Sequence, residues 1–265
     1  MTQGQGQGQG RAGRFIRLSL PRQYIIDLLH FSQKIPSIPV QRTMNIRNTL
    51  VARKRLASPP SWVTIVAKAY AIVCQEFPSL RQSYLALPWA HLYQHPCSLA
   101  SIAIEKVVDG ESAVAFLRIG DLIENSLTSL DACLRQAREE PIENLRSYRL
   151  AKKMYWFPTI LRRTLWWIGL NGSGYYRARH FGTFGVSVYA SLGAESLHPL
   201  SPLTSTLNYG PIDAEGTVNM RLVYDHRVLD GATVARALVR LEEVLKNESV
   251  AELEQLDALA LRKTA

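Results

Sequence analysis

The sequence has few cysteines and no long apolar run, and both absences narrow the class of protein. Cys74, Cys97 and Cys133 are the three cysteines among 265 residues, and no CxxC pair occurs. This favours a reducing compartment over a disulfide framework. Cys74 and Cys133 lie within apolar helical patterns, where we expect buried free thiols. No stretch approaches 18 uninterrupted apolar residues, which argues against a membrane-spanning helix.

Common nucleotide-binding and metal-binding motifs are also missing. We find no GxxxxGK[ST] segment, and no GxGxxG follows a strand pattern. His91 and His95 lie four residues apart, but Pro88 and Pro96 bracket them and no cysteine or carboxylate stands at ligand spacing. We therefore expect no bound metal.

The N-terminal segment lacks the apolar core of a signal peptide. Residues 1–13 contain a Gln-Gly repeat that cannot bury surface, so we expect a disordered tail and a cytoplasmic protein. The rest is apolar enough to form one sizeable core, and no repeat or shift in composition divides it. We expect a single domain at 14–250 and a C-terminal helical tail at 251–265.

Hydrophobic periodicity predicts strands and helices around one large sheet, an α+β or α/β sandwich. The expected strands are 14–20, 40–46, 99–107, 112–119, 182–190, 204–209 and 218–224. The expected helices are 22–33, 62–76, 122–139 and 232–244, with a helical segment at 144–176 that breaks at Pro158 and at 171–174.

The most informative motif is Asp-His-Arg-Val-Leu-Asp-Gly at residues 225–231. It follows a strand pattern and precedes a helical one. A histidine at a strand end is held by backbone on both sides, and imidazole is the side chain best suited to take a proton near neutral pH. Gly231 permits a tight turn before the helix. We interpret His226 as a functional histidine.

The segment 225–243 resembles the signature of the dihydrolipoamide acyltransferase and chloramphenicol acetyltransferase superfamily. Gly-Thr-Phe-Gly-Val-Ser at 182–187 is similar to the Gly-Thr-Phe-x-(Ile/Val)-Ser segment of the same enzymes, and Gln-Lys-Ile-Pro at 33–36 is a weaker match. The resemblance extends over residues 14–247. It implies a chloramphenicol acetyltransferase-like two-layer sandwich, with a large mixed sheet and helices packed on one side. It also implies a catalytic domain at 14–250 and a homotrimer, or a multiple of trimers, with active sites between subunits.

The resemblance also implies the chemistry. An acyl group would pass from an acyl thioester, with coenzyme A as co-substrate, to a hydroxyl, thiol or amine of a small-molecule or lipid-linked acceptor. His226 would be the general base and Ser187 the donor to the oxyanion. Asp230 resembles the structural aspartate of the family, with Arg22 as its expected partner and Gly231 in support. Asp225 and Arg227 are interpreted as surface or turn residues.

Two further functions stay open. The chain could be the catalytic core of a 2-oxo acid dehydrogenase complex, which moves an acyl group between lipoamide and coenzyme A. No lipoylation segment or Ala/Pro linker precedes residue 14, so we expect no lipoyl group on this chain. The other alternative is a catalytically silent oligomeric scaffold, against which the presence of both His226 and Ser187 argues.

Acidic residues are absent between Asn144 and Ala194, although the whole chain has 22. The same segment contains eight of the cations behind the net charge of +9, interleaved with aromatic residues. Four interpretations stay open: a core helix with a charged outer face, a peripheral membrane surface, a site for the phosphates of coenzyme A, and nucleic acid, which is not an expected partner. The membrane- or cofactor-facing candidates are Arg162, Arg163, Trp166 and Trp167.

Overall fold

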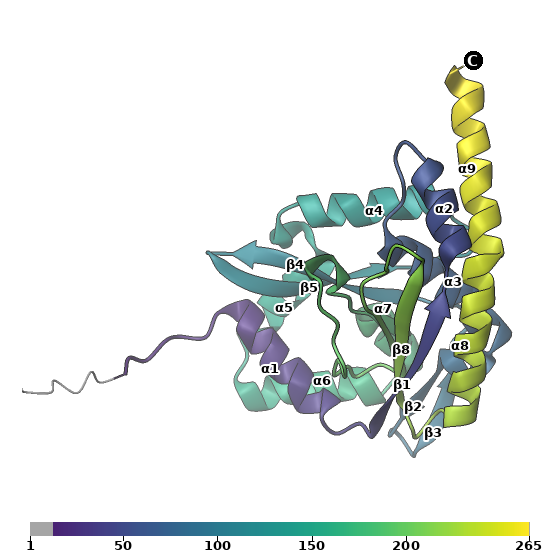
Figure 1. The fold of residues 1–265 in the computed structure, drawn as a ribbon. Coiled ribbons are helices and arrows are strands. Elements are labelled where there is room, and N and C mark those ends of the chain that lie inside the picture. The colour runs from purple at the N-terminus through teal and green to yellow at the C-terminus, as the bar shows by residue number, and fades with distance from the viewer. Residues whose placement is uncertain (1–12, 265) are drawn as a thin grey trace, which may run out of the picture.

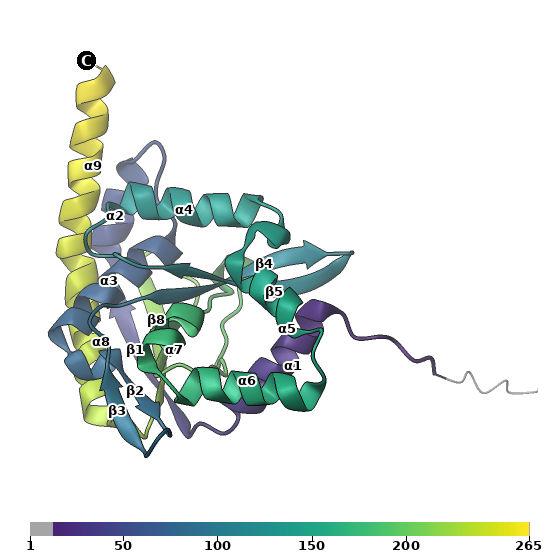
Figure 2. The same cartoon turned by 180° about the vertical axis from the view of Figure 1, so that it is seen from behind.

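A six-stranded mixed sheet organises the computed structural model, which describes residues 13–264 (Figures 1 and 2). The predicted disordered tail at 1–13 therefore falls almost entirely outside the described residues. The strand order is β1-β8-β7-β6-β4-β5, and β6 pairs in parallel with both of its neighbours. The strands are β1 Ser37–Asn45, β4 Ala100–Val108, β5 Glu111–Ile119, β6 Phe184–Val186, β7 Ser205–Tyr209 and β8 Thr217–Asp225. A separate hairpin pairs β2 Gln82–Leu85 with β3 His91–Gln94.

Helices cover one face of the sheet and form the main core with it (Figure 1). The helix α3, Trp62–Glu76, packs against α8, Gly231–Lys246, and α8 contacts β1 and β8. The helix α4, Leu127–Glu139, covers β4 and β5. Outside this layer, α9, Glu248–Thr264, packs along α2, Arg47–Arg55, and α8. No described helix is long and apolar enough to cross a bilayer.

A smaller core lies between the first helix and the basic segment. Here α1, Leu20–Ser32, packs against α6, Thr159–Asn171, through Leu28, Phe31, Trp166 and Leu170. The rings of Phe31 and Trp166 stack with centroids 5.9 Å apart. The short helices α5, Arg146–Met154, and α7, Gly174–Phe181, precede and follow α6.

The predicted sandwich with a large mixed sheet is confirmed. The strand expected at 14–20 is wrong: its end belongs to α1, which begins at Leu20 after the Ser19 side chain caps it. The prediction that Cys133 is buried is also wrong, because α4 turns Leu130 and Leu134 inward and leaves this cysteine exposed. Cys74 is buried, as expected.

Candidate active site

His226 follows the last residue of β8 in a tightly bonded turn. Its backbone N–H donates to the carbonyl of Pro36 at 3.0 Å, and its Nδ1 lies 2.9 Å from the carbonyl oxygen of Leu229. A carbonyl oxygen can only accept, so this contact requires the proton of the neutral ring to be on Nδ1. The Nε2 lone pair then points away from the turn, and the side chain is exposed. This geometry fixes the orientation of the ring and leaves Nε2 able to accept a proton.

The turn is anchored by Asp225, which the sequence does not distinguish from a surface residue. Its side chain is 0% exposed and accepts from the Arg227 guanidinium at 2.7 and 2.9 Å and from the Arg227 backbone N–H at 3.0 Å. The Arg227 guanidinium also lies over the ring of Tyr84, 4.3 Å from its centroid. The interpretation of Asp225 as a surface or turn residue is therefore wrong, because this carboxylate is buried and paired.

A second arginine, which unlike Arg227 is buried, lies close to this anchor. Arg177 of α7 donates to the carbonyls of Tyr84, Leu170 and Pro202 at 2.6–3.1 Å. Burial lowers the pKa of Arg177 to about 10, and the charge of Asp225 opposes that shift. Arg177 thus ties α7 to the β2 hairpin, and Arg227, paired with Asp225, packs the end of β8 against Tyr84 of the same hairpin.

Asp230 does not have the predicted partner. Arg22 lies in α1 and pairs with Glu111 of β5 at 3.0 Å, so the predicted pairing with Asp230 is wrong. Asp230 is exposed at the N-terminus of α8 and makes no ion pair with any residue between 13 and 264. A Cβ at Gly231 would lie 3.4 Å from the Tyr224 hydroxyl, an ordinary van der Waals contact.

Ser187 directly follows β6 and is half-buried. Its backbone N–H donates to Leu207, and its carbonyl accepts from the Asn208 side chain at 2.8 Å. Within the described chain its hydroxyl has no hydrogen-bond partner. Because side chains alternate along a strand, Phe184 and Val186 enter the main core while Gly185 and Ser187 face the opposite side.

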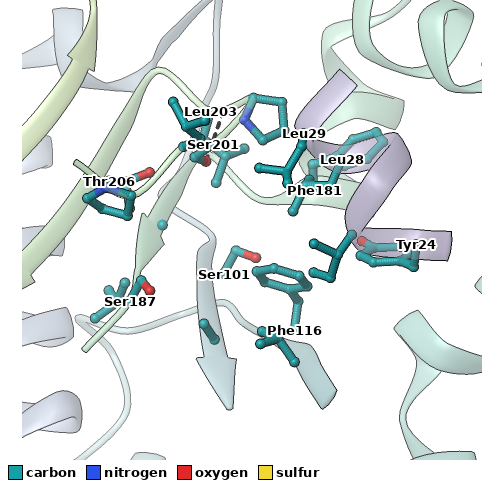
Figure 3. A pocket seen from close by; sticks show the side chains of 18 of the residues that line it. Tyr24, Leu28, Leu29, Ser101, Phe116, Phe181, Ser187, Ser201, Leu203 and Thr206 are labelled. Carbon is teal, nitrogen blue, oxygen red and sulfur yellow. Dashed lines mark hydrogen bonds between the residues drawn. The ribbon is translucent and has the colours of Figure 1, made fainter. Parts of the chain in front are cut away.

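That opposite side holds a cavity of about 290 Å³ between the sheet and α1 (Figure 3). This volume is near the lower end of the range for small-molecule pockets, ~300–1,000 Å³. Apolar side chains from α1 and β5 form one wall, and hydroxyl groups line the sheet side (Figure 3). Apolar lining residues include Tyr24, Leu28, Leu29, Phe116, Phe181 and Leu203; the hydroxyl-bearing ones include Ser101, Ser187 and Thr206.

Thr206 is the polar residue of this cavity that sequence reasoning missed. Its hydroxyl is buried and has no hydrogen-bond partner among residues 13–264. It lies beside Gly185, where a Cβ would come within 2.9 Å of the Thr206 Oγ1 atom. Glycine at 185 therefore leaves room for the Thr206 hydroxyl near Ser187. The period-two pattern of β7 could have placed Thr206 on the cavity side of the sheet, because its neighbour Leu207 faces the core.

In the basic segment between Asn144 and Ala194, two of the four residues predicted to face a membrane or cofactor are buried in the fold. Arg162 and Trp166 are buried, at 7% and 3% exposure, so their assignment as membrane- or cofactor-facing residues is wrong. Arg162 pairs with the fully buried Asp27 of α1, and Arg163 pairs with the same carboxylate at 3.1 Å. Trp167 is 41% exposed. The carboxylate of Asp27 supplies the counter-charge that the acid-free segment lacks.

His91 and His95 do not share a helix face. His91 lies in β3 and contacts the carbonyl of Trp89, whereas His95 is buried and its Nε2 lies 2.9 Å from the Ser83 hydroxyl. Among residues 13–264, no group of three or more potential ligands is placed to hold a metal.

Comparison with known proteins agrees with the C-terminal motif. The family model described as "2-oxoacid dehydrogenases acyltransferase (catalytic domain)" matches residues 201–253, which include the His226 turn and α8. A comparison with curated protein sequences finds no match.

Several solved structures are similar over nearly the whole chain. A probable dihydrolipoamide acetyltransferase from Listeria monocytogenes is 18% identical with a TM-score of 0.63, over 92% of this chain and 95% of that one. The cubic core of a pyruvate dehydrogenase multienzyme complex is 17% identical with a TM-score of 0.63, over 96% and 98%. A chloramphenicol acetyltransferase is 13% identical with a TM-score of 0.51, over 86% and 98%.

The chain has the fold of the dihydrolipoamide acyltransferase and chloramphenicol acetyltransferase superfamily. The resemblance predicted from residues 182–187 and 225–243 is thereby confirmed. Within this superfamily fold, the two motifs lie on β6 and at the end of β8, separated by β7.

Proposed function

We propose that this protein is an acyltransferase in which His226 acts as the general base. The observation that carries the proposal is the contact between His226 Nδ1 and the Leu229 carbonyl, since it fixes the tautomer and leaves Nε2 able to take a proton. The match of residues 201–253 to an acyltransferase catalytic domain supports it. A relative with the same fold, a dihydrolipoamide acetyltransferase from Azotobacter vinelandii, has been studied for the role of a serine, a histidine and an asparagine in its catalytic mechanism.

In the proposed reaction, His226 Nε2 takes the proton of the acceptor as the acceptor attacks the thioester carbonyl. The carbonyl oxygen becomes an oxyanion in the tetrahedral intermediate, and the Ser187 hydroxyl donates a hydrogen bond to it. Collapse of the intermediate breaks the carbon–sulfur bond, and the departing thiolate receives the proton from His226. The chain provides no covalent intermediate in this scheme, and no metal takes part.

The cavity beside Ser187 would hold the part of the substrate nearest the reacting carbonyl. Its apolar wall suits an acyl chain or another apolar group better than a charged one, because burying an unpaired charge is costly. The Thr206 hydroxyl, which has no partner, is available to bind a polar atom of that substrate.

The proposal requires an oligomer, because Ser187 and His226 are not brought together within one chain. The sheet register places Ser187 level with Asn208, and Asn208 pairs with Arg221, five residues before His226. Five residues and two strand spacings amount to on the order of 20 Å. A trimer with sites between subunits, as the resemblance implies, would combine His226 of one subunit with Ser187 of the next.

Two kinds of acyl acceptor are each supported by a different observation. The match at residues 201–253 favours dihydrolipoamide, as in the core of a 2-oxo acid dehydrogenase complex, with coenzyme A as the other thiol. The apolar cavity favours a free-standing enzyme that transfers acyl groups from acyl-CoA to a different small-molecule or lipid-linked acceptor.

The test incubates the full chain with acetyl-CoA and longer acyl-CoA thioesters, each with dihydrolipoamide, a simple alcohol or a simple amine. Mass spectrometry follows the acylated product, and the His226→Ala and Ser187→Ala variants serve as controls. Product that forms with the wild-type chain and falls strongly in both variants supports the proposal, and the best acceptor identifies the reaction. Equal product with the wild-type chain and the His226→Ala variant would refute it.

A further inference from the structure

The α5–α6 turn exposes apolar side chains next to unpaired cations. Trp156 and Ile160 are 87% and 84% exposed, and Phe157 and Leu161 are 44% and 45% exposed. These fractions are unusual for large apolar residues that follow one another in a single turn and the helix after it. Such exposed apolar patches commonly mark interaction sites.

The cations beside this patch are not part of any internal pairing. Arg149, Lys152 and Lys153 of α5 are exposed, and none of their side chains forms an ion pair or hydrogen bond with a residue between 13 and 264. Together with Trp156 they line one shallow depression. The guanidinium groups of Arg162, Arg163 and Arg177, by contrast, are bonded within the fold.

The outer face of α6 continues the apolar surface. Arg162, Trp166 and Leu170 recur every four residues and face inward, where Trp166 and Leu170 pack against α1. The intervening positions face outward and are mostly apolar. Exposed along this face are Ile160, Leu161, Leu165, Trp167 and Ile168.

We propose that this α5–α6 surface binds anionic lipid bilayers peripherally. We define it by Arg149, Lys152, Lys153, Trp156, Phe157, Ile160 and Leu161. Tryptophan and aliphatic side chains enter the headgroup boundary, and cations next to them meet lipid phosphates and carboxylates. No acidic residue occurs between Asn144 and Ala194, so the segment carries no negative charge that an anionic surface would repel.

Charge favours an anionic lipid surface over an isologous contact between two copies of this chain. An isologous contact through the α5–α6 surface would bring two sets of the same three cations together without acidic residues of the segment between them.

The experiment measures flotation of the full chain with vesicles of phosphatidylcholine alone or with 30% phosphatidylserine, at low and high salt. Lys152→Gln/Lys153→Gln is compared with Lys54→Gln/Arg55→Gln, a matched pair of exposed cations on α2. We expect binding to anionic vesicles that salt weakens. The α5 variant should lose affinity about 30-fold and the α2 variant should not.

Trp156→Ser/Ile160→Ser tests the apolar contribution and should also reduce anionic vesicle binding by at least tenfold. A thermal melt checks that each variant is folded.

Equal recovery with neutral and anionic vesicles, or equal losses in the α5 and α2 variants, would overturn the proposal. A changed molar mass of Trp156→Ser/Ile160→Ser in light scattering, with no vesicle binding by the wild type, would assign the surface to contacts between copies. A raised KM for acyl-CoA in Lys152→Gln/Lys153→Gln, with unchanged vesicle binding, would assign it to the thioester.

Discussion

Ser187 and His226 belong to one sheet but are kept apart by its register. Ser187 follows β6 and lies level with Asn208 of β7, which pairs with Arg221 of β8. His226 lies five residues beyond that point, so the two side chains are on the order of 20 Å apart within one chain. A hydrogen bond or proton transfer needs contact of about 3 Å. One chain therefore cannot supply both groups to one substrate.

This separation predicts complementation between inactive variants. His226→Ala and Ser187→Ala homo-oligomers should each show strongly reduced transfer, while mixed oligomers should contain some sites with both residues intact. Activity should reappear after unfolding and refolding the two together, and should not reappear on mixing without subunit exchange. An active monomer in sedimentation analysis would contradict a shared site.

Removing the imidazole should affect chemistry and not folding. His226 is exposed and its ring makes one hydrogen bond, to Leu229, so His226→Ala should change the free energy of unfolding by less than ~1 kcal/mol. Turnover should fall by about 10²–10⁴-fold, the usual contribution of a general base. Steady-state rates and urea unfolding of the same preparations check both parts. Parallel losses of rate and stability would instead indicate a structural histidine.

Asp225 and Asp230 should respond differently to neutralisation. Asp225→Asn leaves the Arg227 guanidinium without its charged acceptor and removes a negative charge near the buried Arg177, which should cost about 1.5–3 kcal/mol and lower the activity with it. Asp230→Asn, at an exposed site without an ion pair, should stay within ~0.5 kcal/mol. Denaturant unfolding of both variants distinguishes them. A larger loss for Asp230→Asn would restore the role that the resemblance implies for this residue.

Much of the sheet and its helices could be predicted from the sequence, because their signals are local. The helix at 62–76 has a serine cap and a continuous apolar pattern, and α3 has those bounds. The strand and helix around His226 likewise follow the predicted periodicity. The hairpin β2–β3 was not predicted, since four-residue strands are too short for a periodic signal.

The errors at the site come from contacts between distant segments. Arg227, which pairs with the buried Asp225, packs on Tyr84 of β2, and that residue is remote in sequence. The assignment of Arg162 as a membrane- or cofactor-facing residue was wrong for the same reason: Asp27 of α1 accepts from Arg162 and Arg163. Asp27 lies on the apolar face of the helix predicted at 22–33, between Tyr24 and Phe31. An acidic residue on such a face could have indicated an internal partner for these cations.

The Asp27 cluster should hold α1 onto α6. Asp27→Asn leaves the buried guanidinium of Arg162 without a counter-charge, so we expect a loss of about 3–5 kcal/mol in the free energy of unfolding. The double variant Asp27→Leu/Arg162→Met replaces the charged pair by apolar groups and should recover most of the lost free energy of unfolding. Urea unfolding measures both. If the double variant is no more stable than Asp27→Asn, the cluster does not act through charge.

His95 should make stability sensitive to mild acid. Burial, with the charges of Arg177 and Arg81, lowers the pKa of His95 to about 4, from 6.5 in an unfolded chain. Between these values the unfolded state binds more protons, so the free energy of unfolding falls as the pH drops from about 6.5 to 4. His95→Asn keeps a polar group near Ser83 but cannot titrate, so its unfolding free energy should fall by about 2 kcal/mol less than that of the wild type over this range. Urea unfolding of both proteins at several pH values measures the difference. Parallel pH profiles would show that His95 is protonated without cost in the folded chain.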